Sequence, residues 1–358
     1  MSTDLKSRII RHIQTSGPLP LAEYMHWCMA DAKAGYYTNQ QAIGARGDFV
    51  TAPEISQMFG ELIGIWAIEA WQTCGSPEQF NLVELGPGKG TLMSDLLRAT
   101  AVLPAFQSAA QINLIETSER LQAIQLEVLG ETNVSWHKSI KSIADQPSII
   151  IANEFLDVLP IRQYVKTDGN WHERVISLND DNKLIWSLSN AKLEAENLPE
   201  GAESEPDGAI LEISTTREAF LISCCEHILK NSGAALFIDY GHEKTGFGDT
   251  FQAMRNHGFA DPLEAPGEAD LTSHVDFGAL ANIAREAGLE VKPLMTQGDF
   301  LIKLGLLERA GQLGHGKSEE MQAQITSAVE RLAGPQEMGT LFKVFCVSVR
   351  DMKLPPFD

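Results

Sequence analysis

Apolar residues follow two different periods along the chain, and each period predicts a different kind of element. Near the N-terminus the spacing is helical. It predicts two short helices, one with an apolar face of Leu5, Ile9, Ile10 and Ile13 and one over residues 21–29. Pro18 and Pro20 break the chain between these helices. An irregular, glycine-containing stretch over residues 35–49 follows.

A longer helix is predicted to begin at Thr51. Thr51 and Glu54 have the S/T-x-x-E spacing of a capping box, and Pro53 stands in the first turn, where it removes no hydrogen bond. Apolar residues then recur at helical spacing, at Ile55, Met58, Phe59, Leu62, Ile63 and Trp66. We expect residues 1–75 to form a helical N-terminal extension that packs on the rest of the chain.

From Phe80 onward, apolar strands alternate with helical segments, which is the pattern of a parallel sheet. The predicted strands cover residues 81–85, 111–116, 133–137, 148–152, 234–240, 289–295 and 341–349. The main helices between them begin near residues 91, 118, 215, 275 and 318. We therefore predict an α/β core with a doubly wound, Rossmann-like sheet over residues 76–358.

The pattern changes to short strands and turns over residues 160–212. Segments 162–166, 171–178 and 183–188 read as antiparallel strands, with turns at residues 167–169 and 179–182. Residues 190–208 are acidic and rich in Pro and Gly, which indicates an exposed loop. We interpret the whole region as an antiparallel β insertion between sheet elements rather than as an independent domain.

The charge balance limits the classes of partner. The formal net charge is 28 − 48 = −20. This argues against nucleic acid and anionic lipid, since both attract clustered Lys and Arg side chains. A basic protein partner fits better, although acidity can also serve solubility alone. We expect no nucleic-acid partner.

The cysteines and the lengths of the apolar runs indicate the cellular compartment of the protein. The five cysteines are an odd number and include no C-x-x-C pair, so a zinc or redox motif is not expected. No apolar run approaches the length of about 18 residues that a membrane span needs, and the N-terminus lacks a secretory pattern. We expect a bacterial cytoplasmic protein with no membrane insertion and no metal ion.

A glycine loop carries the strongest functional signal. Gly86, Gly88 and Gly90 lie between a predicted strand and a helix, where open α/β sheets bind ligands. A P-loop is excluded, because Lys89 is followed by Gly90 rather than by Ser or Thr. The G-x-G-x-G spacing also departs from the G-x-G-x-x-G of dinucleotide folds. A glycine turn with only a packing role is the remaining alternative.

Two further positions are consistent with an adenosine ligand. Glu116 ends the next strand, where a carboxylate can accept hydrogen bonds from both ribose hydroxyls. NAD folds use the same arrangement, so Glu116 does not distinguish between cofactors. Trp136 and His137 end the third strand, where an adenine can stack, and a half-buried aromatic side chain is an equal alternative.

Several segments together resemble the MidA-like methyltransferases, a family that includes the respiratory complex I assembly factor that methylates an arginine. They are GDFVTAPEISQMFGE (47–61), the glycine loop with Glu84 before it, ANEFLDVLP (152–160), FIDYG (237–241), and residues 261–272. The chain departs from the family at Lys138, where many members have an acidic residue, and this puts an adenine contact there in doubt.

The resemblance implies a class I fold, an antiparallel last strand at the sheet edge and S-adenosylmethionine as cofactor. It implies that Glu84 helps to hold the ammonium group of the cofactor and that the glycines leave room for its methionine portion. Asp48, Thr51 and Asn153 are also expected near the cofactor. The implied protein substrate is the large hydrogenase-like subunit of respiratory complex I or a homologue.

Residues 153–157 follow the fourth strand, where class I methyltransferases place the methyl acceptor. An arginine acceptor stays protonated, so carboxylates are needed to grip it and to localise its charge. We predict Glu154 in this role, with Asp157 second and Asp239 or Glu212 as more remote candidates. For Asp157, an electrostatic role at a helix N-terminus is an equal alternative.

Three other functions stay open from the sequence. A metal-dependent hydrolase would use Asp239, His242, His257, Asp261 and His274, whose spacing matches no ligand motif that we can name. A scaffold could bind the cofactor without turnover, although the glycine loop, Glu84 and Glu116 are all intact. Methylation of a small molecule or of another residue type is the third.

Overall fold

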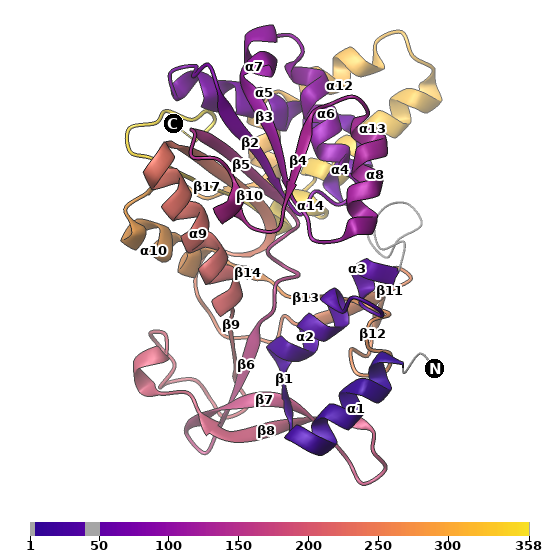
Figure 1. The fold of residues 1–358 in the computed structure, drawn as a ribbon, viewed down its shortest axis with the longest axis vertical. Helices are drawn as coiled ribbons and strands as arrows, with labels where there is room; N and C mark the ends of the chain where they lie inside the picture. Colours follow the sequence, from indigo (N-terminus) through magenta and orange to yellow (C-terminus); the bar gives the residue numbers. More distant parts are fainter. Residues whose placement is uncertain (1–3, 40–50, 358) are drawn as a thin grey trace. The chain divides into compact units, whose positions relative to one another are not determined.

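The computed structural model describes residues 4–39 and 51–357, and Asp48 lies outside these ranges (Figure 1). The chain forms two compact units. The large unit comprises Val50–Leu156, Phe220–Glu243 and Val275–Asp358, and the small unit comprises Met1–Phe49, Asp157–Ala219 and Lys244–His274. Among the described residues, no helix is long and apolar enough to cross a membrane.

The large unit is built on a mixed sheet in the order β15-β17-β10-β5-β2-β3-β4, which confirms the predicted Rossmann-like fold. The parallel strands are β2 (Phe80–Leu85), β3 (Ala110–Ile115), β4 (Val134–His137), β5 (Ser148–Asn153) and β10 (Gly233–His242). Strands β2 and β5 are buried over their whole length, as expected for strands covered on both faces.

The last strand, β17 (Phe342–Ser348), lies antiparallel to β10, as predicted. It is not the outermost strand, because β15 (Glu290–Val291) and β16 (Met295–Thr296) pair with it. These two pieces replace the single strand predicted over residues 289–295. Pro293 lies between them, and a proline has no N–H to donate to a ladder. The short strand β14 (Val275–Asp276) pairs with β10.

Helices cover both faces of this sheet (Figure 1). They are α4 (Ala52–Ile55), α5 (Gln57–Thr73), α6 (Thr91–Thr100), α7 (Pro104–Ala109), α8 (Glu119–Leu129), α9 (Thr215–Asn231), α10 (Phe277–Ala287), α11 (Gln297–Lys303), α12 (Leu306–Gly314), α13 (Glu319–Ala333) and α14 (Met338–Leu341). Helix α5 lies close to α6, since a Cβ atom at Gly60 would be 2.6 Å from the Cβ atom of Asp95.

The predicted capping box at Thr51 is wrong. The Thr51 side chain makes no capping hydrogen bond, and α4 is only one turn long before the chain becomes extended at Ser56. Ser56 caps α5 instead, accepting from the backbone N–H of Met58 at 3.3 Å. The Glu54 carboxylate binds Lys89 and Thr91, and these contacts replace the local hydrogen bond that the spacing suggested.

The small unit contains the predicted antiparallel strands. Its larger sheet consists of β1 (Leu19–Pro20), β6 (Arg162–Thr167), β7 (Asn170–Leu178), β8 (Leu184–Lys192) and β9 (Ile210–Ile213). A second sheet contains β11 (Gln252–Arg255), β12 (Gly258–Ala260) and β13 (Asp270–Thr272), and the helices are α1 (Leu5–Ser16), α2 (Leu21–Ala30) and α3 (Tyr36–Asn39). The loop predicted over 190–208 begins later, because β8 extends to Lys192.

The two units divide the chain differently from the ranges 1–75 and 76–358 that the sequence suggested. In strand β1, Leu19 pairs with Ile176 and Pro20 with Val175, so the N-terminal helices join the inserted strands. Helix α5, by contrast, belongs to the large unit. Local periodicity predicts many of the individual elements, but it carries no information on which distant strand a given strand pairs with.

Candidate functional site

The glycine loop joins β2 to α6 in the large unit, and its backbone requires glycine. The φ angles are 62° at Gly86, 54° at Gly88 and 85° at Gly90, in the left-handed region that side chains disfavour. The Gly86 N–H donates to the carbonyl oxygen of Ile115 at 3.1 Å. The loop is thereby fixed against the end of β3, as expected of a ligand-binding turn.

Gly86 is also confined by an aromatic ring. A Cβ atom at this position would be 2.6 Å from Cδ2 of Phe155, and the Phe155 ring lies 4.9 Å from the Phe220 ring between centroids. Phe155 belongs to the segment that follows β5. Because Gly86 has no side chain, there is room for the Phe155 ring against it. The loop after β2 and the loop after β5 can therefore lie in contact.

Glu84 lies two residues before the first glycine and is 3% exposed. Burial raises the pKa of its carboxyl group to about 8. A hydrogen bond from the backbone N–H of Met93, in the first turn of α6, lowers this pKa by a smaller amount. Among the described residues, Oε2 of Glu84 has no hydrogen-bond partner. A buried carboxylate oxygen without a partner fits a position next to a cationic group of a ligand.

Glu116 follows β3 and is 9% exposed. Burial raises the pKa of its carboxyl group, against the lowering effect of hydrogen bonds that include Ser118 and Gln125. The backbone N–H of Ser118 donates to Oε1 at 2.7 Å, and Nε2 of Gln125 lies 3.4 Å from Oε2. These donors hold the carboxylate in one orientation at the carboxyl end of the sheet.

The aromatic residue at the end of β4 is partly buried. Nε1 of Trp136 donates to Oε1 of Gln125 at 2.8 Å, which links the indole to the same amide that reaches Glu116. Nε2 of His137 lies 2.9 Å from Oδ1 of Asn113, and burial lowers the pKa of this imidazole. Adenine stacking on Trp136 stays a prediction.

The segment after β5 contains Glu154, which was predicted to bind the arginine that accepts the methyl group. Glu154 has a φ of 49°, and its backbone N–H donates to the carbonyl oxygen of Ile238 at 2.9 Å. Its Oε1 accepts from the backbone N–H of Ala52 at 2.9 Å and from Nδ2 of Asn153 at 3.0 Å. Glu154 is thus oriented from both sides, by β10 and by the start of α4.

Asp239, predicted as a more remote candidate for the acceptor, is hydrogen-bonded to the backbone. It is 1% exposed, Oδ2 accepts from the backbone N–H of Leu156 at 2.9 Å, and Oδ1 accepts from its neighbour Tyr240 at 2.9 Å. Both carboxylate oxygens therefore bind backbone N–H groups. Asp239 fixes the course of the chain just after Glu154.

Asp157 and Glu212 belong to the small unit. Asp157 is 5% exposed, and its carbonyl oxygen accepts from the backbone N–H of Ser273 at 3.1 Å and from Arg217 at 3.0 Å. The Glu212 carboxylate accepts from Gln163 at 2.7 Å and from the backbone and hydroxyl of Thr250. Glu212 thus joins β9 to the segment that leads into β11.

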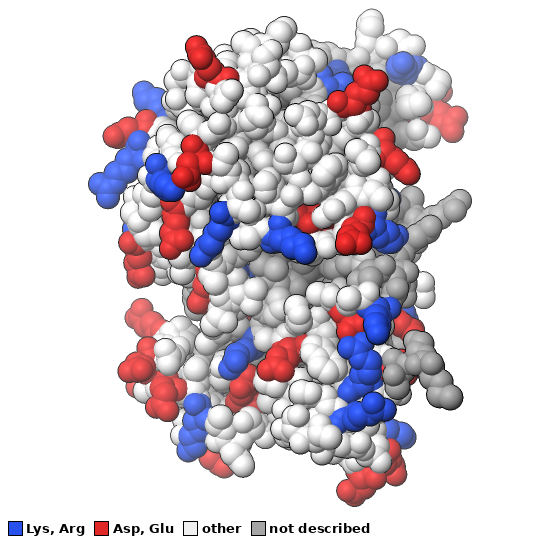
Figure 2. All heavy atoms as spheres, viewed as in Figure 1, with Lys and Arg blue, Asp and Glu red and all other residues white. Residues whose placement is uncertain are grey.

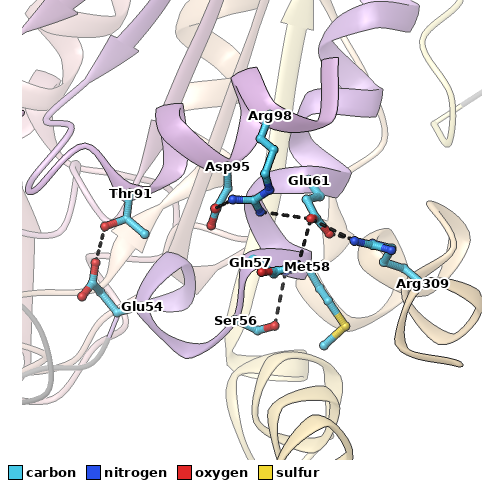
Figure 3. Close-up of polar contacts among 9 residues, drawn as sticks. All are labelled: Glu54, Ser56, Gln57, Met58, Glu61, Thr91, Asp95, Arg98 and Arg309. Atoms are coloured by element: carbon cyan, nitrogen blue, oxygen red, sulfur yellow. Dashed lines mark hydrogen bonds and ion pairs between the residues drawn. The ribbon is translucent and has the colours of Figure 1, made fainter. Parts of the chain in front are cut away.

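Helix α4 is attached to the glycine loop and to the first residue of α6. The Glu54 carboxylate accepts from the hydroxyl of Thr91, as Figure 3 shows, and forms an ion pair with Lys89 at 3.2 Å between Oε2 and Nζ. Since Glu154 holds the backbone N–H of Ala52, the helix connects the two loops. Thr51, predicted near the cofactor, is half-buried immediately before this helix.

A second cluster in Figure 3 joins α5, α6 and α12. Glu61 accepts from Nε and Nη2 of Arg309 at 2.7 and 3.0 Å and from Arg98 at 3.0 Å. Arg98 also binds Asp95 at 2.6 Å. Burial raises the pKa of the Glu61 carboxyl group, but the two guanidinium groups outweigh it and lower the pKa overall.

The residues of the metal hydrolase alternative belong to both units. His242 and Asp276 lie 3.9 Å apart in the large unit, and His257, Asp261 and His274 belong to the small unit. In residues 4–39 and 51–357, no group of three or more His, Cys, Asp or Glu side chains is arranged to hold a metal ion.

The buried carboxylates at the ends of β2 and β3, together with the left-handed glycines, fit S-adenosylmethionine. Residues 62–295 match the model of a family of S-adenosyl-L-methionine-dependent methyltransferases. The chain belongs to this family.

Relatives of this methyltransferase cover nearly its whole length. The protein arginine methyltransferase NDUFAF7 of Danio rerio is 34% identical over 97% of this chain and 88% of its own. The Drosophila melanogaster homologue is 35% identical over 95% of this chain and 83% of its own. A crystal structure from Burkholderia thailandensis bound to S-adenosylhomocysteine has a TM-score of 0.83 at 26% identity, and covers 98% of this chain and 92% of that chain.

Sequence analysis missed two residues that organise the site of this methyltransferase, Gln125 and Phe155. Gln125 had a detectable signal. It shares one face of α8 with Leu121 and Leu129 at a spacing of four residues, and all three are buried. A polar residue on a buried helix face needs hydrogen-bond partners, so this position was a candidate for a role beyond packing.

Proposed function

We propose that this methyltransferase transfers a methyl group from S-adenosylmethionine to an arginine side chain of a protein. Two of its full-length relatives carry the name protein arginine methyltransferase, which supports this acceptor. The structural observation that carries the proposal is Glu154, a half-buried carboxylate held in a left-handed backbone conformation at the carboxyl end of β5.

A guanidinium acceptor makes specific demands on the protein. It keeps its proton at neutral pH and its nitrogen lone pairs are delocalised, so it is a weak nucleophile. A carboxylate that binds it draws the positive charge toward the bound N–H groups and stabilises the proton that must leave. A fixed carboxylate is therefore the group that this acceptor needs most.

Glu154 meets this demand through its surroundings. A left-handed backbone is unfavourable for a glutamate, so contacts from neighbouring elements must hold it. Those contacts come from Ile238 on β10, Asn153 on β5 and Ala52 on α4. Such restraint favours a single carboxylate orientation, which suits a group that must position its partner.

The remaining roles follow from the same assignment. Bound S-adenosylmethionine supplies an electrophilic methyl group on a sulfonium. Glu154 would hold the guanidinium so that one nitrogen faces that methyl group. By accepting hydrogen bonds from the guanidinium N–H groups, the carboxylate would also stabilise the departure of the proton that this nitrogen must lose. Asp157, as a second carboxylate for the acceptor, stays a prediction.

For the cofactor we propose contacts along the ends of β2 and β3. The Glu84 carboxylate faces its ammonium group, the glycine loop (Gly86, Gly88, Gly90) accommodates its methionine portion, and Glu116 accepts from its ribose hydroxyls. The burial of both carboxylates supports this arrangement, because a buried carboxylate needs a cation or hydrogen-bond donors. Asn153 and Thr51 complete the proposed cofactor contacts, and Asp48 keeps its predicted role there.

The protein substrate we propose, from the family resemblance, is the large hydrogenase-like subunit of respiratory complex I or a homologue. On the face drawn in Figure 2, both blue and red side chains are present. Over the whole sequence 48 acidic residues stand against 28 basic ones, a balance that disfavours nucleic acid as a partner. A cytoplasmic location is part of the proposal, supported by five free cysteines, of which four are buried.

The test compares the chain with its Glu154→Gln variant. A glutamine oxygen still accepts from Ala52 and Asn153, so the fold around β5 is kept while the negative charge is lost. We expect transfer of labelled methyl groups to the substrate protein to fall by about a hundredfold or more, with unchanged affinity for S-adenosylhomocysteine.

Unaltered turnover in Glu154→Gln would overturn the role of Glu154. Binding of S-adenosylhomocysteine without any transfer by the unsubstituted protein would favour a scaffold instead. Transfer to a small molecule or to another residue type would overturn the arginine acceptor.

A further inference from the structure

One fully buried side chain of the large unit reaches three parts of the proposed cofactor site. Gln125 on α8 is 0% exposed. Its Nε2 donates to the carbonyl oxygen of Gly88 at 2.8 Å and lies 3.4 Å from Oε2 of Glu116, and its Oε1 accepts from Nε1 of Trp136 at 2.8 Å. These partners lie in the glycine loop and at the ends of β3 and β4.

We infer that Gln125 is a positioning residue for the cofactor, which aims the Glu116 carboxylate at the ribose and fixes the glycine loop beside it. The inference rests on the ribose contact proposed for Glu116. It adds a residue from a helix that provides none of the predicted cofactor contacts.

The hydrogen-bond capacity of the amide supports a role in orientation. Its NH₂ group has two donors, one for Gly88 and one for Glu116, and its oxygen accepts from Trp136. The Glu116 carboxylate receives Gln125 on one oxygen and Ser118 on the other. The backbone N–H of Thr117 is a third donor to this carboxylate. Because a carboxylate accepts up to about four hydrogen bonds, it keeps a site for a ribose hydroxyl.

Packing alone does not account for this amide. Gln125 occupies a buried helix face between Leu121 and Leu129, where an apolar side chain would avoid the cost of burying polar atoms. The helix also lies close to the glycine loop, since a Cβ atom at Gly90 would be 3.4 Å from Cγ of Gln125. The amide, anchored on α8, therefore holds both the glycine loop and the Glu116 carboxylate in fixed positions relative to this helix.

The test is calorimetric titration of the full chain with two ligands, S-adenosylhomocysteine and its analogue without the ribose 2′-hydroxyl. The variant is Gln125→Met, which keeps the side-chain length and removes all three hydrogen bonds. We expect its Kd for S-adenosylhomocysteine to rise by about tenfold or more. Its preference for this ligand over the 2′-deoxy analogue should fall at the same time, because Glu116 is no longer aimed at the ribose.

Gln122→Met is the matched control. Gln122 lies on the same helix and donates to the carbonyl oxygen of Glu116 at 2.9 Å, so it contacts the backbone rather than the carboxylate. We expect this variant to keep the preference of the unsubstituted chain between the two ligands. An equal loss of affinity for both ligands in Gln125→Met would overturn the positioning role, because a packing defect does not distinguish them.

Trp136→Phe provides a second route if Gln125→Met fails to fold. It removes the N–H that holds the Gln125 oxygen and leaves the amide in place. We expect a smaller loss of affinity and the same fall in preference, and an unchanged preference would contradict the inference. Failure of the unsubstituted chain to bind S-adenosylhomocysteine would instead overturn the cofactor site itself.

Discussion

Glu154 and Ala52 are 102 residues apart in the sequence, yet the Glu154 carboxylate accepts the backbone N–H of Ala52 at 2.9 Å. The contact joins the end of β5 to the first residue of α4. Glu154 is therefore part of the fold as well as the proposed grip on the acceptor. Substitutions at this position must separate these two roles.

Glu154→Ala and Glu154→Gln separate them. The alanine variant leaves the Ala52 N–H without its acceptor, and we expect its free energy of unfolding to fall by about 1–3 kcal/mol. The glutamine variant keeps an acceptor oxygen and should remain close to the unsubstituted chain. Urea unfolding of both variants measures the difference, and equal stability losses would show that charge, rather than the hydrogen bond to Ala52, matters to the fold.

Gly86→Ala should weaken cofactor binding. The new Cβ atom would be 2.6 Å from the Phe155 ring, in addition to the cost of a left-handed alanine, about 1 kcal/mol or more. Gly130→Ala is the control, because Gly130 has a φ of 59° and a Cβ atom there would meet no other atom within 4 Å. We expect titration with S-adenosylhomocysteine to show a loss of affinity only for Gly86→Ala, and equal behaviour would contradict the contact with Phe155.

Glu84 should make the stability of the protein depend on pH. Its pKa is raised from 4.5 to about 8, so between these values the folded chain holds a proton that the unfolded chain has released. Stability conferred by the protonated group is therefore complete at low pH and decreases as the pH rises toward 8. Glu84→Gln should flatten this decrease in urea unfolding measured from pH 5.5 to 8. An identical pH profile in both proteins would show that Glu84 ionises normally in the folded chain.

Glu61 should contribute to stability through its two arginines. Glu61→Gln removes the carboxylate that Arg98 and Arg309 share, while Arg98 keeps its ion pair with Asp95. Since both guanidinium groups are partly exposed, we expect a loss of only about 1–2 kcal/mol in the free energy of unfolding. The loss should diminish as the pH falls below the normal pKa of a glutamate toward the lowered pKa of Glu61 in the folded chain, because the carboxylate is then protonated in the folded chain as well. Glu69→Gln, at an exposed site on the same helix, is the control for urea unfolding. A similar loss in both variants would rule out the cluster as the cause.

Much of the fold could be predicted because it is encoded locally. Strands β2 and β5 are short and mainly apolar, and β10 has an apolar stretch before Asp239. These strands alternate with helices along the sequence, which is the pattern of a parallel sheet covered on both faces. Helix α8 begins at Glu119, close to the predicted start near residue 118, and the Ser118 side chain caps it by accepting from the backbone N–H of Leu121. The glycine loop could be recognised because its left-handed backbone restricts three positions to one residue type.

The parts that could not be predicted depend on distant contacts. Glu54 has the spacing of a capping box but binds Lys89 and Thr91, a competition that the local sequence does not reveal. Helices α11 and α12 were missed. The pairing of β1 with β7 decides which unit contains the N-terminal helices, and it joins residues far apart in the sequence. Gln125 acquires its role only when the ends of β2, β3 and β4 come together.

The measurement that tests the central proposal most directly is identification of the methylated atom. The purified chain is incubated with deuteriomethyl S-adenosylmethionine and the hydrogenase-like subunit, and the labelled residue is located by peptide mass spectrometry. We predict the label on a guanidinium nitrogen of one arginine, and its absence when Glu154→Gln replaces the unsubstituted chain. Label only on another residue type, or no label while S-adenosylhomocysteine still binds, would contradict the proposal.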